Sequence, residues 1–186
     1  GMIKEIRPSD VWYEGRTDFG IAQIDTPLTS HSDSGFELLQ GKSAFSGEIL
    51  GGCIDTIYDM FHGERYEDMP LLCAKYGLFP TIEEWTGKIL LLESSEEKMD
   101  PEKYQKAMIT LKETGIFDVI SGVLVGKPMN RIYEQEYKRI LVDVIDNPNL
   151  PAVCNINIGH TQPRCIIPFG VEATVDTEHQ VIRFAN

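Results

Sequence analysis

The chain has 186 residues, of which 42% are hydrophobic and 25% charged, and its formal net charge is -12. This length and composition are typical of one well-cored globular domain, which we expect to span residues 2–186. The acidic balance argues against a nucleic-acid partner, and the lack of any run of about 18 apolar residues argues against a membrane partner. With no signal pattern at the N-terminus, a cytoplasmic location is expected.

The first 50 residues are typical of short strands separated by turn residues. The strand-like segments are FGIAQID (19–25), GFELLQG (35–41) and SAFSGEI (43–49). The polar stretch TPLTSHSDSG (26–35), which contains His31, predicts a mobile loop. CIDTIYDMF then places apolar residues at helical spacing, so a short helix should begin directly at the glycine pair that precedes it.

Strand and helix signals alternate through the middle of the chain. KILLLE (88–93) is a nearly continuous apolar run that suits a strand buried on both faces. ISGVLVG (120–126) and PAVCNINI (151–158) are the next two predicted strands. One amphipathic helix is expected between Asp100 as N-cap and Gly115, and another over RIYEQEYKRILVDVID.

This order predicts an α/β fold with a central parallel βαβαβ unit, because short connections between alternating strands and helices favour right-handed crossovers. The final segment, VEATVDTEHQVIRF, alternates across a polar turn and predicts an added hairpin. Open parallel sheets form their sites outside the carboxyl ends of the strands. The candidate functional residues should therefore be sought where these strands end.

Two titratable residues follow strand ends. Glu93 is the last residue of the first parallel strand, and His160 follows the third strand by one glycine. We expect both at one edge of the sheet, within hydrogen-bond reach. A carboxylate that orients an imidazole forms two-thirds of a triad with a nucleophilic serine, but the chain has no G-x-S-x-G elbow. From spacing alone, an ordinary surface or hydrogen-bonded histidine and a turn-capping glutamate are favoured over a catalytic pair.

Longer segments resemble a known peptidase family. GKILLLESSEEKMDPEKYQKAMITLKETGIFDVISGVLVGKP, LPAVCNINIGHTQPRCIIPFGVEATVD and the upstream GEILGGCIDTIYDMFHG resemble the C-terminal domain of the LD-carboxypeptidase family of serine peptidases. That family includes muramoyltetrapeptide carboxypeptidases and microcin C self-immunity proteins, and the SSEEK form after the glutamate is more similar to the self-immunity branch. The resemblance covers most of residues 45–176.

The resemblance implies a swivelling β/β/α domain and a divided active site. In this family an N-terminal domain supplies the nucleophilic serine and the oxyanion donors, while Glu93 and His160 resemble the triad's glutamate and histidine. The nucleophile domain is absent from this sequence, so the resemblance implies that the isolated chain is inactive. Implied substrates are murein peptides with an L,D bond and peptide–nucleotide conjugates.

The implied partners are such a substrate and the nucleophile domain. The domain edge that receives the nucleophile domain should be apolar around Ile166 and Ile167, and a homodimer through the same edge is a further expectation. The alternative function is that of a binding protein rather than an enzyme: a stand-alone, non-catalytic module for murein fragments or a partner chain.

Several residues keep two readings. Gly51 and Gly52 would either offer free N–H groups to a substrate carboxylate or permit close backbone packing. Trp12 and Trp85 would stack on a ligand or pack internally, and packing is favoured for Trp85. The paired glutamates are expected to be solvated surface.

The cysteines and histidines form no metal-binding pattern. The four cysteines contain no CxxC and lie in or beside apolar stretches, so buried free thiols are expected. The histidines form no HExxH and have no metal-type spacing to the cysteines. Neither a metal nor an organic cofactor is implied.

Overall fold

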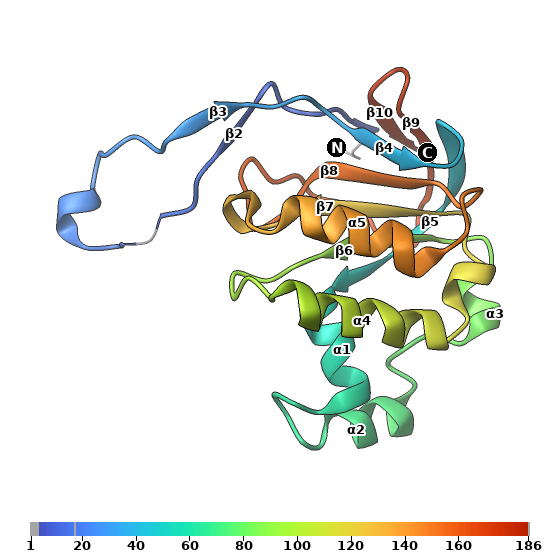
Figure 1. Ribbon diagram of the computed structural model, residues 1–186. Helices are drawn as coiled ribbons and strands as arrows, with labels where there is room; N and C mark the ends of the chain where they lie inside the picture. Colours follow the sequence, from blue (N-terminus) through green and yellow to red (C-terminus); the bar gives the residue numbers. More distant parts are fainter. Residues whose placement is uncertain (1–3, 17, 186) are drawn as a thin grey trace.

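One mixed sheet organises the described part of the chain, residues 4–16 and 18–185, in the computed structural model (Figure 1). Its strands are β1 (Glu5–Ile6), β4 (Glu37–Gln40), β5 (Ala44–Cys53), β6 (Ile89–Glu93), β7 (Gly122–Lys127), β8 (Ala152–Gly159), β9 (Glu172–Asp176) and β10 (Val181–Phe184). They lie in the order β1-β10-β9-β5-β6-β7-β8-β4. Strands β5 to β8 are parallel, whereas β4, β9, β10 and β1 add antiparallel pairs on either side. The predicted α/β fold with added strands is confirmed.

Helices lie on one face of the parallel strands (Figure 1). Helix α1 follows β5, α4 connects β6 to β7, and α5 connects β7 to β8. The α-helices are α1 (Ile54–His62), α2 (Met69–Tyr76), α3 (Ile82–Trp85), α4 (Pro101–Glu113) and α5 (Glu134–Ile145). Because each parallel strand runs in the same direction, all their carboxyl ends meet at the edge that lies on the left in Figure 1.

Helix ends follow local capping chemistry. The Asp100 side chain accepts a hydrogen bond from the Lys103 N–H at 2.9 Å, so α4 begins at the predicted N-cap. Helix α5 begins later than expected, at Glu134, because a 3₁₀ turn, η3 (Met129–Arg131), precedes it. Tyr133 then has a left-handed φ of 59° and interrupts the helical path.

Each face of the sheet buries its own apolar core. Trp85 is only 2% exposed and packs within the core beneath the helices, which confirms packing as its role. The second core lies on the other face, where β1, β10 and the segment before β4 contribute side chains. All four cysteines are free, as expected; Cys73 and Cys154 are buried, and the other two are half-buried.

The segment from Val11 to Ser32 is a projecting arm rather than a strand followed by a mobile loop. Its two strands pair antiparallel, and Trp12 stacks on His31 with ring centroids 4.2 Å apart. The predicted loop therefore contains a strand, because its backbone pairs with the Val-Trp-Tyr segment. The arm consists of β2 (Val11–Tyr13), η1 (Ile21–Gln23) and β3 (Ser30–Ser32), and it extends past the carboxyl edge of the sheet (Figure 1).

FGIAQID is not a strand. It forms the 3₁₀ turn η1 at the outer end of the arm, where the backbone has no neighbouring strand to pair with among the described residues. Phe19 and Ile21 are 85% and 87% exposed there. The apolar pattern of this segment therefore serves neither a strand nor the core of the domain.

The glycine pair lies within β5, which continues to Cys53, so the pair does not open a helix; α1 begins at Ile54. Gly51 has a φ of 148°, and a Cβ there would lie 1.9 Å from the Leu91 carbonyl oxygen. Gly51 is therefore required for the close approach of β5 and β6, which supports the packing reading. Gly52 has a φ of 153° but open space where a Cβ would project.

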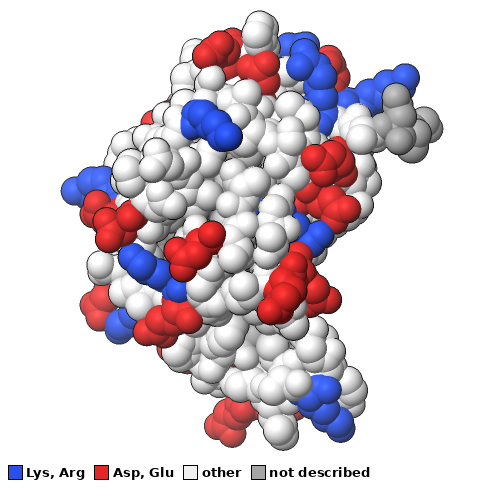
Figure 2. Space-filling model, turned by 90° about the vertical axis from the view of Figure 1, so that its right-hand side faces the viewer, with Lys and Arg blue, Asp and Glu red and all other residues white. Residues whose placement is uncertain are grey.

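The surface is mixed in charge on the side opposite the carboxyl edge. Figure 2 shows this side, with Lys and Arg interspersed among Asp and Glu. Among the residues described, no helix is both long and apolar enough to cross a membrane.

Candidate active site

Glu93 and His160 meet at the carboxyl edge of the parallel strands. The Nδ1 atom of His160 lies 3.0 Å from Oε2 of Glu93 and 2.9 Å from the Ser94 carbonyl oxygen. Because a carboxylate and a carbonyl only accept, Nδ1 carries the hydrogen in both contacts. The expectation that these two side chains come within hydrogen-bond reach is confirmed. Their catalytic role remains a prediction.

The glycine before the histidine gives the imidazole its direction. Gly159 ends β8 with a left-handed φ of 89°, and a Cβ there would lie 2.8 Å from the Lys127 carbonyl oxygen and 3.4 Å from the Glu93 Cβ. Only glycine fits this turn without displacing the neighbouring strands. The strand therefore ends sharply and presents His160 across the edge to Glu93.

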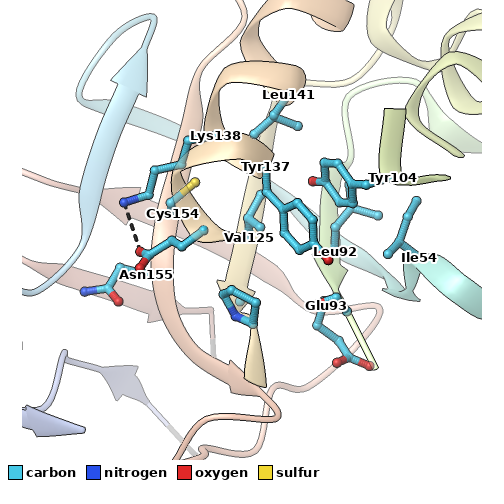
Figure 3. Close-up of a pocket in the computed structure, with 14 residues that line it drawn as sticks. Ile54, Leu92, Glu93, Tyr104, Val125, Tyr137, Lys138, Leu141, Cys154 and Asn155 are labelled. Carbon is cyan, nitrogen blue, oxygen red and sulfur yellow. Dashed lines mark ion pairs between the residues drawn. The ribbon is translucent and has the colours of Figure 1, made fainter. Parts of the chain in front are cut away.

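The Glu93 carboxyl lies at the rim of an apolar pocket between α4, α5 and the sheet (Figure 3). Ile54, Leu92 and Val125 line this pocket, together with the stacked rings of two tyrosines. Burial raises the pKa of Glu93 above its ordinary value, although the neighbouring His160 partly offsets this by favouring the charged form. Glu93 is thus a desolvated carboxylate whose main partner is the imidazole.

No serine among the described residues presents its hydroxyl to His160 within hydrogen-bond distance. Ser94 and Ser95, which follow Glu93, are 6% and 8% exposed and are not presented to solvent. Cys53 lies beside Glu93 in the parallel register, but burial raises the pKa of its thiol to about 11. A protonated thiol is a poor nucleophile, so neither Cys53 nor a serine of the described residues presents a nucleophile to His160.

Glu96 is a site residue that sequence reasoning assigned to solvated surface. Its Oε2 lies 3.1 Å from Nε2 of His160, although its side chain is 67% exposed. Both ring nitrogens of His160 therefore face carboxylate oxygens in this structure. The signal for this contact was weak, because Glu96 belongs to the acidic run SSEEK and lies in an irregular loop.

A buried ion pair fixes the arm to the same edge. Nζ of Lys127, at the end of β7, lies 3.0 Å from Oδ2 of Asp33, and both side chains are fully buried. Asn155 donates to Oδ1 of Asp33 at 2.5 Å, and Lys127 also donates to Asn157. Burial alone raises the pKa of Asp33, but these donors outweigh it and leave that pKa below its ordinary value.

The other predicted site residues lie nearby without joining the histidine. Gly51 and Gly52 flank the end of β6, and Gly52 is in register with Leu92, one residue before Glu93. Trp12 is 9% exposed, and its face is covered by His31, so its ring is not open to a ligand in this structure. Among the described residues, no group of three or more His, Cys, Asp or Glu side chains could hold a metal ion.

The apolar edge expected near Ile166 is present in part. Ile166 is 75% exposed, whereas Ile167 is half-buried and packs against the second core. Phe19, Ile21 and Ile24 on the arm add exposed apolar side chains beyond the same edge.

Comparison with known proteins identifies a family for most of the chain. Residues 46–175 match the LD-carboxypeptidase C-terminal domain. A crystal structure of an MccF-like protein from Streptococcus pneumoniae in complex with AMP superposes with a TM-score of 0.96 at 55% identity, covering 99% of this chain. A structure of MccF in complex with glutamyl sulfamoyl guanosine, at 20% identity and a TM-score of 0.75, shares the fold over 98% of this chain.

The relatives are longer than this chain. A provisionally named carboxypeptidase of Vibrio cholerae is 26% identical over 146 residues, which are 77% of this chain and 39% of that protein. The microcin C7 self-immunity protein MccF of Escherichia coli is 24% identical over 150 residues, 76% of this chain and 37% of that protein. Likewise, the match covers only 53% of the Streptococcus pneumoniae chain and 50% of the MccF chain.

Proposed function

Since the chain belongs to the LD-carboxypeptidase C-terminal domain family, we propose that it supplies the glutamate and histidine of a Ser-Glu-His triad in a serine carboxypeptidase. The observation that carries this proposal is the 3.0 Å contact between Nδ1 of His160 and Oε2 of Glu93 at the carboxyl edge of the sheet. The family supports a hydrolase of the serine carboxypeptidase type.

In the proposed reaction, the serine hydroxyl of a companion domain attacks the carbonyl carbon of the scissile amide. Nε2 of His160 takes the hydroxyl proton and then donates it to the leaving amine, which departs with the bond's electron pair. Water then attacks the ester carbonyl carbon while His160 takes its proton, and His160 returns that proton to the serine oxygen as the ester C–O bond breaks. Glu93 holds Nδ1–H and stabilises the imidazolium in both halves of the reaction.

Glu96 has to leave Nε2 before that nitrogen can accept a proton from a hydroxyl. Its high exposure and its place in an irregular loop allow such a movement at low cost. In the assembled enzyme the serine hydroxyl would therefore take the position that the Glu96 carboxylate occupies here.

The companion domain is the nucleophile-bearing N-terminal domain of the family. Two observations support this part of the proposal: the Streptococcus pneumoniae chain is nearly twice the length matched here, and apolar side chains on the arm and at Ile166 are exposed. A domain that docks at this edge would cover those side chains and bring its serine to His160.

Two substrate classes are proposed. Murein peptides with an L,D bond follow from the family. Conjugates of an amino acid or peptide with a nucleotide are supported by the Streptococcus pneumoniae relative, which was crystallised with AMP, and by the glutamyl sulfamoyl guanosine complex of MccF. Both classes offer an amide or related acyl bond close to an anionic group.

A chimaera tests the proposal. This chain would replace the corresponding part of the Streptococcus pneumoniae protein, and both the chimaera and the isolated chain would be assayed on an LD-tetrapeptide and on an aminoacyl-nucleotide conjugate. We expect hydrolysis by the chimaera and none by the isolated chain, which lacks an activated nucleophile. A folded but inactive chimaera beside an active parent would favour the non-catalytic binding module.

A further inference from the structure

We propose that Arg164, together with Arg16, forms a subsite beside His160 for the terminal anionic group of the substrate. This inference rests on the proposed function and adds a recognition element to it. The anionic group is a carboxylate in a murein peptide and a phosphate in a nucleotide conjugate. The two sources share one chemistry, a compact group with several acceptor oxygens that a guanidinium binds with paired hydrogen bonds.

The subsite is a cleft that opens directly beside the imidazole. Its volume is about 350 Å³, within the size range of small-molecule sites. One wall is the arm, and the other is formed by the segment that follows β8 and by Met129. The lining includes His160, Glu96 and two arginines, Arg16 and Arg164.

The side-chain charges that line this cleft are mainly positive, although the whole chain is acidic. Two arginines line it in a protein whose formal net charge is -12. Glu96 is the single acidic side chain in the lining, and it faces His160. The local balance therefore favours an anion next to the group that would transfer the proton.

Arg164 is available to such an anion. Its side chain is exposed, and no carboxylate of the described residues lies within 4.0 Å of its guanidinium, the limit for an ion pair. Arg16 differs, because it donates to Oε1 of Gln23 at 3.3 Å and to the Thr26 carbonyl oxygen. Arg16 is thus held in place by the arm, and Arg164 is the donor free to close on a ligand.

Several contacts hold the two walls in fixed relation. The Gly15 N–H donates to Oδ1 of Asn130 at 2.7 Å, and the Tyr13 N–H donates to the Gln162 carbonyl oxygen at 2.9 Å. The buried Asp33–Lys127 pair anchors the base of the arm to the strand that adjoins Gly159. The cleft is therefore formed before any ligand arrives, which lowers the entropic cost of binding.

The position of the subsite fits the proposed chemistry. Nε2 of His160 has to reach the leaving amine, so groups beside it contact the leaving side of the substrate. In a carboxypeptidase that side ends in a free carboxylate, and in a nucleotide conjugate it carries the phosphate. An arginine in this position would hold the leaving group in line with the proton donor.

Binding of small anions to the isolated chain tests the inference without any need for catalysis. The probes are N-acetyl-D-alanine for the carboxylate, phenyl phosphate for the phosphate, and N-acetyl-D-alaninamide as the neutral control. Titrations followed by NMR should give Kd values on the order of 1 mM for a charged probe, with shifts at His160 and Arg164. The amide should not bind.

Variants then assign the binding to the cleft. Arg164→Gln should weaken binding roughly tenfold, about 1.4 kcal/mol, whereas Arg164→Lys should lose less because it keeps the charge. Arg139→Gln is the matched control, since Arg139 is exposed on α5 outside the cleft, and it should bind as the wild type does.

The outcomes separate this inference from the proposed function. Binding of the carboxylate alone identifies a murein-type ligand, and tighter binding of the phosphate identifies a nucleotide-type ligand; both support the subsite. Absence of binding by either anion, or equal losses in Arg164→Gln and Arg139→Gln, would overturn it. Anion binding in a protein whose chimaera is inactive would leave the subsite intact and reject only the triad.

Discussion

Replacing Lys127 by methionine is expected to destabilise the fold by about 3–5 kcal/mol, because it removes the closest cation from a buried carboxylate. Lys127 and Asp33 are both fully buried, and Nζ lies 3.0 Å from Oδ2. Asn155 still donates to Asp33 in the variant, but an amide cannot neutralise a charge. The nearest remaining cation is Arg131, whose guanidinium is 3.9 Å from Oδ1 of Asp33 and already paired with Glu134. The cost should fall on the base of the arm first, since Asp33 directly follows β3.

The double variant Asp33→Asn, Lys127→Met provides the control. It removes both charges, so it should lose much less stability than Lys127→Met alone, because replacing a buried pair by groups of similar volume is often close to neutral. The difference between the single and double variants therefore isolates the penalty of the unpaired charge from that of altered packing.

Urea unfolding followed by circular dichroism measures these changes. At roughly 2–4 °C per kcal/mol for a domain of this size, the single variant should also melt about 6–20 °C below the wild type. A loss below about 1 kcal/mol for Lys127→Met would refute the reasoning, since a buried ion pair cannot be broken so cheaply. Equal losses in the single and double variants would refute it as well.

Substitutions at Glu93, at the glycine pair and at Tyr104 test three other features of the structure. Glu93→Gln should raise the melting temperature near pH 7 and lose this advantage near pH 4. Burial raises the folded-state pKa of Glu93, so the protonated carboxyl stabilises the wild type below the ordinary pKa of about 4.3. The wild type loses that stability as the pH rises through the folded-state pKa, whereas glutamine is neutral throughout. A constant difference across this range would contradict the assignment. Gly51→Ala should lower the free energy of unfolding in urea by at least about 2 kcal/mol, because the new Cβ would lie 1.9 Å from the Leu91 carbonyl oxygen. Gly52→Ala should lower it less, because a Cβ at that position has open space and only the positive φ is strained. Tyr104→Phe should be neutral or stabilising by up to about 1 kcal/mol, because the buried Tyr104 hydroxyl has no hydrogen-bond partner; a clear loss of stability would reveal a hidden partner.

The parallel centre of the fold and the Glu93–His160 contact were both predictable from the sequence. Apolar runs bounded by amphipathic helices determine that the strands are parallel, and parallel strands bring their carboxyl ends to one edge. Glu93 and His160 are thereby placed on the same edge, and the two side chains meet there although β7 lies between their strands. Glycine before the histidine strengthened that prediction, because it marks a turn at the end of the strand.

The arm and its anchor were not predictable, because they depend on pairings between distant segments. TPLTSHSDSG has no apolar alternation that indicates a strand, and its third-last residue, Asp33, finds Lys127 only after the sheet has formed. The apolar segment FGIAQID predicted a strand that the structure does not contain, because a local pattern cannot show whether a neighbouring strand is available for pairing.

The loop residues that surround His160 could not be identified from the sequence for a related reason. Glu96, Arg16 and Arg164 carry ordinary surface charges in irregular segments, and no spacing rule places them at one cleft. Only the arm's position beyond the carboxyl edge brings Arg16 to the same space as Arg164. Long-range geometry, rather than composition, creates the candidate anion subsite.

The central claim is that His160 acts as the base for a serine supplied by another domain, and its most direct test is kcat/KM of the chimaera with and without His160→Ala. We expect the variant to lose at least about 10²-fold while keeping its fold, as removal of a general base does. His179→Ala is the control, because His179 lies in the exposed β9–β10 turn and contacts Asp176; it should retain full activity. Undiminished hydrolysis by the His160→Ala chimaera would contradict the account.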